Sequence, residues 1–192
     1  MQPAGDTEPM PEIRRSALVG HAAARMFALV NDVPAYPRRF GWCEAAQVLE
    51  QSQDRMVARL ELRMGSLRTW FTTENTLVPP HHIDMRLVDG PFRSLSGRWE
   101  FHALDESACK VTLVLAFEPA SRLLAPAMAL GFQALADRMV DDFVKVADRA
   151  AEAGMPVADG CGAPRDPGRR GDGVAAQAHA PDRLPARGRH RR

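Results

Sequence analysis

The residues best suited to nucleophilic chemistry are the three cysteines, Cys43, Cys109 and Cys161. A catalytic thiol needs an adjacent base and a site that stabilises an oxyanion, and no motif around these residues supplies either. The chain also lacks the GxSxG motif of serine hydrolases. The wide spacing of the cysteines argues against a zinc site, a redox pair or a disulfide framework. We therefore predict that Cys109, which precedes a strand, is a small buried apolar residue.

Histidines and carboxylates in the middle of the chain are the next candidates for chemistry. His81 and His82 follow a Pro-Pro pair, which predicts a solvated turn, and no further metal ligands lie nearby in the sequence. Glu74, Asp84 and Glu100 could meet across strands, but they form no recognisable acid–base pair. We can assign no acid, base or electrophile, so we predict no catalytic residues, no metal and no catalytic cofactor.

The elements that would position these side chains are mostly strands. Apolar and polar residues alternate in residues 56–64, 83–87, 95–101 and 111–117, whereas residues 67–77 are rich in β-branched and aromatic types. Residues 12–20 form a further predicted strand. Short links between the runs predict an antiparallel meander. The stretch LVDGPFRSLSGRWEF, residues 87–101, is predicted to be a hairpin that turns at Asp89-Gly90-Pro91.

A change of period after Pro119 predicts a long helix over residues 122–151. A shorter helix is predicted before it, ending near Asn31, Asp32 and Pro34. A curved sheet with one apolar face must cover that face, and the long helix is the predicted element that can do so. The helix would present one apolar stripe, formed by Leu124, Met128, Phe132, Leu135, Met139, Phe143 and Val146.

Charge is distributed unevenly along the chain. The formal net charge is +1, but arginines concentrate after residue 153, which leaves residues 1–153 slightly acidic. Such a body lacks the basic surface that gripping a nucleic-acid backbone requires, so we predict no DNA partner. The first nine residues contain no apolar h-region, and no apolar run approaches the roughly 18 residues that span a bilayer. We therefore predict a cytoplasmic protein.

The composition changes at residue 154, where Gly, Pro, Ala and Arg replace large apolar residues. A segment of this kind cannot bury enough surface to offset its ordering entropy, so residues 154–192 are predicted to be a disordered tail. Its arginines could contact RNA or an acidic surface. The alternative is that these arginines have no function and only reflect an arginine-rich proteome.

Four segments carry a resemblance to a known family: VNDVPAYP (30–37), FTTENTL (71–77), LVDGPF (87–92) and GRWEF (97–101). Together they resemble the RatA and coenzyme-Q-binding START-like family, whose members are also labelled cyclase/dehydrase proteins. The match runs from Met10 to about Ala151, so we predict a single domain over residues 10–153. Residues 1–9 would then be a disordered extension or the product of a misassigned start codon. The segment RRFGWC (38–43) departs from the family pattern because Gly41 replaces a proline.

The resemblance implies an α+β fold of the START-like helix-grip type, with a curved antiparallel sheet around the C-terminal helix and a hydrophobic tunnel between them. The favoured hypothesis is non-enzymatic binding of ubiquinone or a similar isoprenoid lipid in support of respiratory electron transport. It implies peripheral contact with the inner membrane. The alternative is a RatA-type toxin that binds the large ribosomal subunit and blocks subunit association. An aromatase- or cyclase-like enzyme ranks third, since a fold does not carry its chemistry with it.

The predicted ligand-binding residues are the apolar side chains that should face the tunnel. Flexible methionines among them would suit a pocket that adapts to its ligand. The alternative is that these residues simply fill the core. They are Trp42, Leu60, Leu62, Phe71, Met85, Leu87, Phe92, Trp99, Phe101, Leu113, Met128, Phe132, Leu135 and Met139.

Overall fold

The predicted meander is present as an antiparallel sheet. The computed structural model describes residues 12–153 apart from 122 and 124, and within them the sheet has seven strands in the order β1-β7-β6-β5-β4-β3-β2. This arrangement confirms the predicted fold class. The strands are β1 (Glu12–Val19), β2 (Cys43–Gln51), β3 (Arg55–Met64), β4 (Leu67–Val78), β5 (His82–Asp89), β6 (Phe92–Ala103) and β7 (Cys109–Pro119).

Strand β2 is the element that sequence analysis missed. Its sequence, CEAAQVLEQ, has no run of alternating large apolar residues, because most of the strand is exposed or half-exposed at the sheet edge. Two register irregularities, between Cys43 and Ala45 and between Val48 and Glu50, further disturb its pattern. Pairing with β3, rather than a burial signal of its own, therefore makes this segment a strand.

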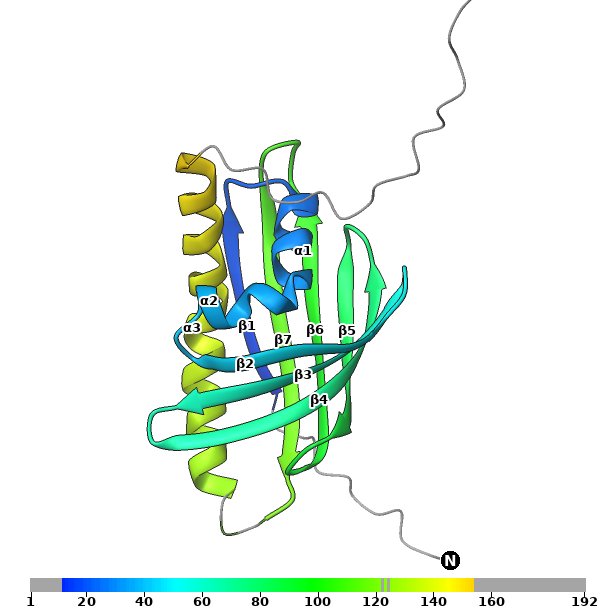
Figure 1. Cartoon of the computed structure of the whole chain (residues 1–192). Helices are drawn as coiled ribbons and strands as arrows, with labels where there is room; N and C mark the ends of the chain where they lie inside the picture. Colours follow the sequence, from blue (N-terminus) through cyan, green and yellow to red (C-terminus); the bar gives the residue numbers. More distant parts are fainter. Residues whose placement is uncertain (1–11, 122, 124, 154–192) are drawn as a thin grey trace, which may run out of the picture. The chain divides into compact units, whose positions relative to one another are not determined.

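The sheet is strongly curved, and this curvature creates its inner face. In Figure 1, β2, β3 and β4 run across the direction followed by β1, β7 and β6. A register shift at Thr72/Thr73 interrupts the pairing of β4 with β5, and such bulges bend and twist a strand. The predicted turn between β5 and β6 is confirmed. There a Cβ on Gly90 (φ 149°) would lie 3.0 Å from the Phe71 Cβ, so glycine permits the close approach.

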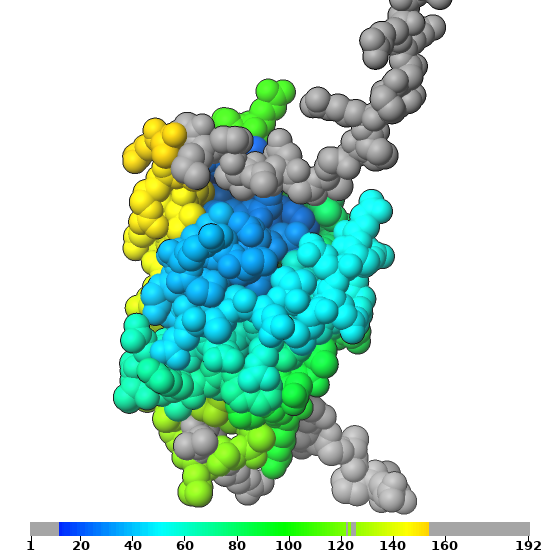
Figure 2. All heavy atoms as spheres, viewed as in Figure 1, coloured from blue at the N-terminus to red at the C-terminus, as the bar shows by residue number. Residues whose placement is uncertain are grey.

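Helices cover the inner face of the sheet. They are α1 (Ala23–Asn31), the 3₁₀ turn η1 (Val33–Ala35), α2 (Tyr36–Arg39) and α3 (Ala125–Glu152). Helix α3 packs against β1 and β7 and also touches β3, β4 and α1. Pro126 is its second residue, where proline costs no hydrogen bond. The space-filling view shows α1 and α2 next to the edge strand β2 (Figure 2).

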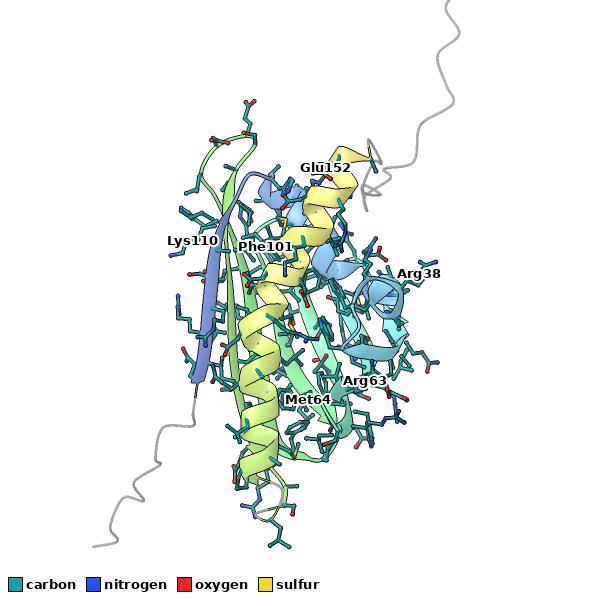
Figure 3. The ribbon with its side chains drawn as sticks, turned by 90° about the vertical axis from the view of Figure 1, so that its left-hand side faces the viewer. Arg38, Arg63, Met64, Phe101, Lys110 and Glu152 are labelled. Carbon is teal, nitrogen blue, oxygen red and sulfur yellow. The ribbon has the colours of Figure 1, made fainter. Side chains whose placement is uncertain are left out.

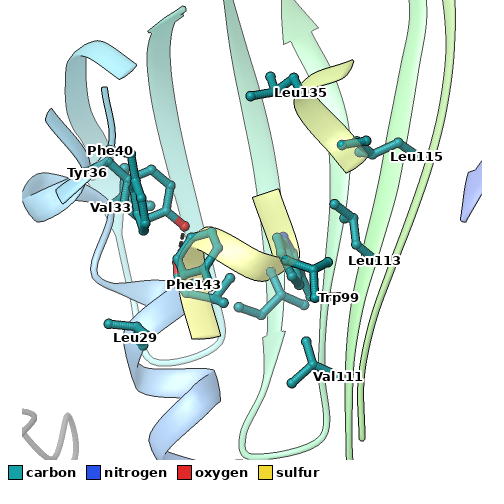
Figure 4. Close-up of a cluster of buried hydrophobic side chains, with 14 of the residues drawn as sticks. Leu29, Val33, Tyr36, Phe40, Trp99, Val111, Leu113, Leu115, Leu135 and Phe143 are labelled. Carbon is teal, nitrogen blue, oxygen red and sulfur yellow. Dashed lines mark hydrogen bonds between the residues drawn. The ribbon is translucent and has the colours of Figure 1, made fainter. Parts of the chain in front are cut away.

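Two sets of aromatic rings tie the helices to the sheet. Phe143 on α3 lies 4.5 Å from Phe40, 5.4 Å from Tyr36 and 5.3 Å from Trp99, measured between ring centroids (Figure 4). In the second set, Phe132 lies 4.8 Å from Phe117. Rings at these separations contribute beyond the area that they bury. Leu124 and the predicted tail, residues 154–192, lie outside the described residues, as do residues 1–9.

Candidate ligand-binding cavity

A cavity of about 70 Å³ lies between the inner face of the sheet, α3 and the α1–α2 segment. It exists because a curved sheet and a straight helix do not match in shape, and side chains fill the gap incompletely. The structure places most of the predicted ligand-binding residues in its lining: Trp42, Leu60, Leu62, Phe71, Met85, Trp99, Leu113, Phe132, Leu135 and Met139.

The other predicted residues lie outside the lining, and packing explains each case. Phe101 stacks on Trp99 with its edge toward Phe27 of α1. Phe92 packs against the rings of Phe71, Phe117 and Phe132. Met128 is fully buried in the core near the start of α3, and Leu87 is half-buried near the end of β5. Period alone identifies the inner face but does not separate the cavity wall from the core.

Three polar residues in the lining, Asn31, Thr73 and Asn75, were not predicted. Thr73 and Asn75 occupy inward positions of β4, between Phe71 and Leu77, where a strand on an apolar core usually carries aliphatic residues. The polar residues at these inward positions of FTTENTL (71–77) could therefore have identified this part of the cavity wall from the sequence. Asn31, by contrast, was interpreted as a helix end, which it is, and its place in the wall depends on how α1 docks. The remaining unpredicted lining residues are Val30, Val33, Tyr36, Ala58, Ile83, Leu95 and Leu115.

Several polar atoms of the lining are buried without a hydrogen-bond partner: Asn31 Oδ1, Asn75 Oδ1 and the indole Nε1 of Trp42. Only 7% of Asn75 and 1% of Trp42 is exposed. A buried donor or acceptor left unpaired costs about 1–3 kcal/mol, so native proteins rarely keep one without a reason. Tyr36 shows the usual arrangement in the same wall, since its hydroxyl donates to the Val30 carbonyl oxygen at 2.5 Å.

None of the described residues that line the cavity is charged. Its titratable side chain is Tyr36, and burial raises the pKa of that phenol far above its usual value. Cys43 lies next to the lining residue Trp42, and burial raises the pKa of its thiol to about 11, with the Glu61 carboxylate adding to the effect. General acid–base catalysis uses groups that titrate near neutral pH, and the described wall supplies none.

The carboxylates considered above lie instead on the outer face of the sheet. Glu74 accepts hydrogen bonds from Arg55 at 2.7 Å and Arg86 at 2.9 Å, and these bonds lower its pKa. Asp84 accepts two from Arg98, at 2.5 and 2.9 Å, which likewise lower its pKa. Glu74 and Asp84 are thus held ionised by arginine on the face of the sheet opposite the cavity.

A cluster of basic residues lies at one edge of the protein, and we call Arg38, Arg63 and Arg68 the arginine edge. The side chains of Arg63 and Arg68 are 53% and 73% exposed, and both face the single carboxylate of Glu44, at 3.9 and 3.3 Å. Arg63 also donates to the carbonyl of Gly41, just after α2, which carries the exposed Arg38. Figure 3 shows Arg38 and Arg63 on the same side of the molecule.

Sheet, helix and cavity together define a START-like helix-grip protein. The chain belongs to the family described as polyketide cyclase/dehydrase and lipid transport, whose model matches residues 19–144. The crystal structure of the Zhui aromatase/cyclase from Streptomyces sp. R1128 covers 77% of this chain and 99% of its own, with a TM-score of 0.68 and 19% identity. At that identity the likeness concerns the fold.

Two curated relatives differ in their names. Ribosome association toxin RatA of Pseudomonas aeruginosa is 48% identical over 131 residues, which make up 68% of this chain and 91% of that protein. Coenzyme Q-binding protein COQ10 of Drosophila melanogaster, a mitochondrial protein, is 25% identical over 135 residues, 68% of this chain and 56% of that protein. Within the described residues, no helix is both long and apolar enough to cross a membrane.

Proposed function

We propose that this protein is a ribosome-association toxin of the RatA type, which binds the large ribosomal subunit and blocks subunit association in the cytoplasm without catalysis. The observation that carries the proposal is the 48% identity to RatA across 91% of that relative's length. This supports the alternative hypothesis of the sequence analysis over ubiquinone binding.

The arginine edge is the surface we assign to ribosome contact. Ribosomal RNA presents a dense array of phosphates, and exposed arginines bind phosphate while releasing counterions. Arg63 and Arg68 share one facing carboxylate, Glu44, so positive charge remains available there. Arg39, the neighbour of Arg38, is engaged with Asp32 at 2.8 Å and contributes less.

Sedimentation of lysates after overexpression tests the proposal. The wild-type protein should increase free subunits at the expense of assembled ribosomes, and the triple variant R38E/R63E/R68E should lose this effect. The matched control R138E/K145E/R149E reverses the same number of charges on α3. An unchanged subunit profile with wild-type protein would overturn the proposed function. Equal effects of the two triple variants would overturn the assignment of the arginine edge.

Binding of an isoprenoid quinone is a second candidate function, supported by the apolar cavity wall and the COQ10 relative. The cavity volume argues against a long ligand in this conformation. About 70 Å³ is well below the roughly 300–1,000 Å³ of typical ligand pockets, so a tail would require α3 and the sheet to separate. Organic extraction of protein purified from its own host tests this candidate. Absence of any quinone would contradict it.

A further inference from the structure

We infer that the cavity holds a binding site for a small uncharged molecule that carries a hydroxyl group, with Asn75 and Asn31 as the residues that recognise it. This inference rests on the cavity-binding candidate function and not on the ribosome proposal. It names a ligand chemistry and polar contacts that an apolar quinone tunnel does not require.

The first argument is the position of the polar atoms. Asn75 Oδ1 and Asn31 Oδ1 are buried without partners, although both residues line an otherwise apolar cavity. Asn75 is more than nine-tenths buried, so bulk water does not solvate it. A donor group of a ligand in the cavity would supply a missing hydrogen bond and remove the cost of leaving the atom that it reaches unpaired.

The second argument concerns the charge of the ligand. Among the described residues, the wall contains no Asp, Glu, Lys, Arg or His, and an ion in such surroundings would lack a counter-charge. The ligand is therefore neutral. Asn31 is also the last residue of α1, whose C-terminal carbonyls carry partial negative charge. That end of the cavity favours a group that donates a hydrogen bond.

A hydroxyl group meets these requirements better than a carbonyl. Its single hydrogen donates to the amide oxygen of Asn75 or of Asn31, and its oxygen accepts from the indole N–H of Trp42 or from an amide nitrogen. A carbonyl can only accept. The volume limits the ligand to a compact group, of the order of a single ring once Met85 and Met139 adjust, since an engineered apolar cavity of about 150 Å³ accommodates benzene.

Phenol and toluene provide a matched pair of probes, because they have the same number of non-hydrogen atoms and differ in the hydroxyl. Binding is followed by NMR of the methionine methyl groups, since Met85 and Met139 line the cavity. The measured quantity is the ratio of the two dissociation constants, toluene over phenol. We expect Asn75→Leu to lower this ratio by about tenfold, the effect of one lost hydrogen bond to a buried group. Thr76→Val, the neighbouring outward-facing residue on β4, should leave it unchanged.

Each result has a defined meaning. Toluene binding with an unchanged ratio in Asn75→Leu overturns the hydroxyl site while leaving the cavity as an apolar binding site. If neither probe binds to the wild type and water alone occupies the cavity, both the hydroxyl site and the apolar binding site are overturned. A second readout protects against a variant that simply unfolds. Replacing an unpaired buried amide by an apolar side chain should raise the Tm of ligand-free Asn75→Leu above that of the wild type, and a lower Tm would contradict the inference.

Discussion

The outer and inner faces of the sheet differ in whether their polar side chains have hydrogen-bond partners. On the outer face, Glu74 and Asp84 are each held by arginines at hydrogen-bond distance. On the inner face, Asn75 is almost fully buried, yet its Oδ1 has no partner. The two arrangements alternate along β4, where Glu74 and Asn75 are consecutive residues. Glu74 and Asp84 on the outer face are satisfied by this protein itself, whereas Asn75 Oδ1 of the inner wall is available to another molecule.

This contrast predicts a hierarchy of effects, with packing on the inner face at the top. Phe143→Ala removes a ring that contacts Tyr36, Phe40 and Trp99. We expect it to lower the free energy of unfolding by about 3–5 kcal/mol, because it leaves a void that the surroundings cannot close. Urea titration measures this change. Leu18→Ala, at a position 74% exposed on the outer face, is the control and should change stability by less than about 0.5 kcal/mol.

A charge placed on either face tests the contrast directly. Asn75→Asp would bury a carboxylate without a counter-charge and should lower the free energy of unfolding at neutral pH by about 3 kcal/mol. The loss should shrink as the pH falls, because burial raises the pKa of the new carboxyl and its neutral form is tolerated. Urea titrations at several pH values measure both effects.

The control for this charge is Thr76→Asp, one residue away on the outer face. Thr76 lies opposite Arg55 on β3 and opposite Asp84 on β5. The attraction of the new carboxylate to Arg55 and its repulsion from Asp84 therefore nearly cancel. We expect a change below about 1 kcal/mol. Equal effects at positions 75 and 76 would show that the two faces do not differ as described.

A smaller effect is expected from a methyl group added to the cavity wall. A Cβ on Gly97 would lie 2.5 Å from Met85 Cε and 2.7 Å from Leu115 Cδ2, two lining residues. Gly97→Ala should therefore destabilise the protein by about 1–2 kcal/mol and weaken toluene binding, because Met85 must move into the cavity. Gly41→Ala, with nothing within 4 Å of the added Cβ, should do neither. Thermal unfolding and the NMR titration are the measurements.

The smallest effect concerns an ion pair of the outer face. Asp84→Asn should lower the free energy of unfolding by about 0.5 kcal/mol at neutral pH, since exposed pairs contribute little. Arg98 lowers the pKa of Asp84 below its usual 3.8, so the stabilisation is present above that value and is lost as the pH falls through the folded-state pKa. The variant and the wild type should therefore converge in acid. Urea titrations near pH 7 and below about pH 3 measure this; a constant difference would contradict the assignment.

The fold could be predicted from the sequence to a large extent. Period-two alternation on β3, β6 and β7, and the change to helical period after Pro119, depend on local geometry and are visible in a single chain. The same applies to the turn at Gly90. Strand β2 could not be predicted in this way, because an exposed edge strand carries little hydrophobic pattern.

Only the tertiary structure determines which residues line the cavity. Alternation assigns Phe101 and Trp99 to the same inner face, yet Trp99 lines the cavity while Phe101 packs against α1. Asn31 enters the wall only through the docking of α1, and Arg63 joins Arg38 only through the contact between β3 and the loop after α2. The physical reason is that a residue's own sequence neighbours determine which face it occupies. Which distant elements it meets, and where they leave a gap, depends on sheet curvature and helix packing.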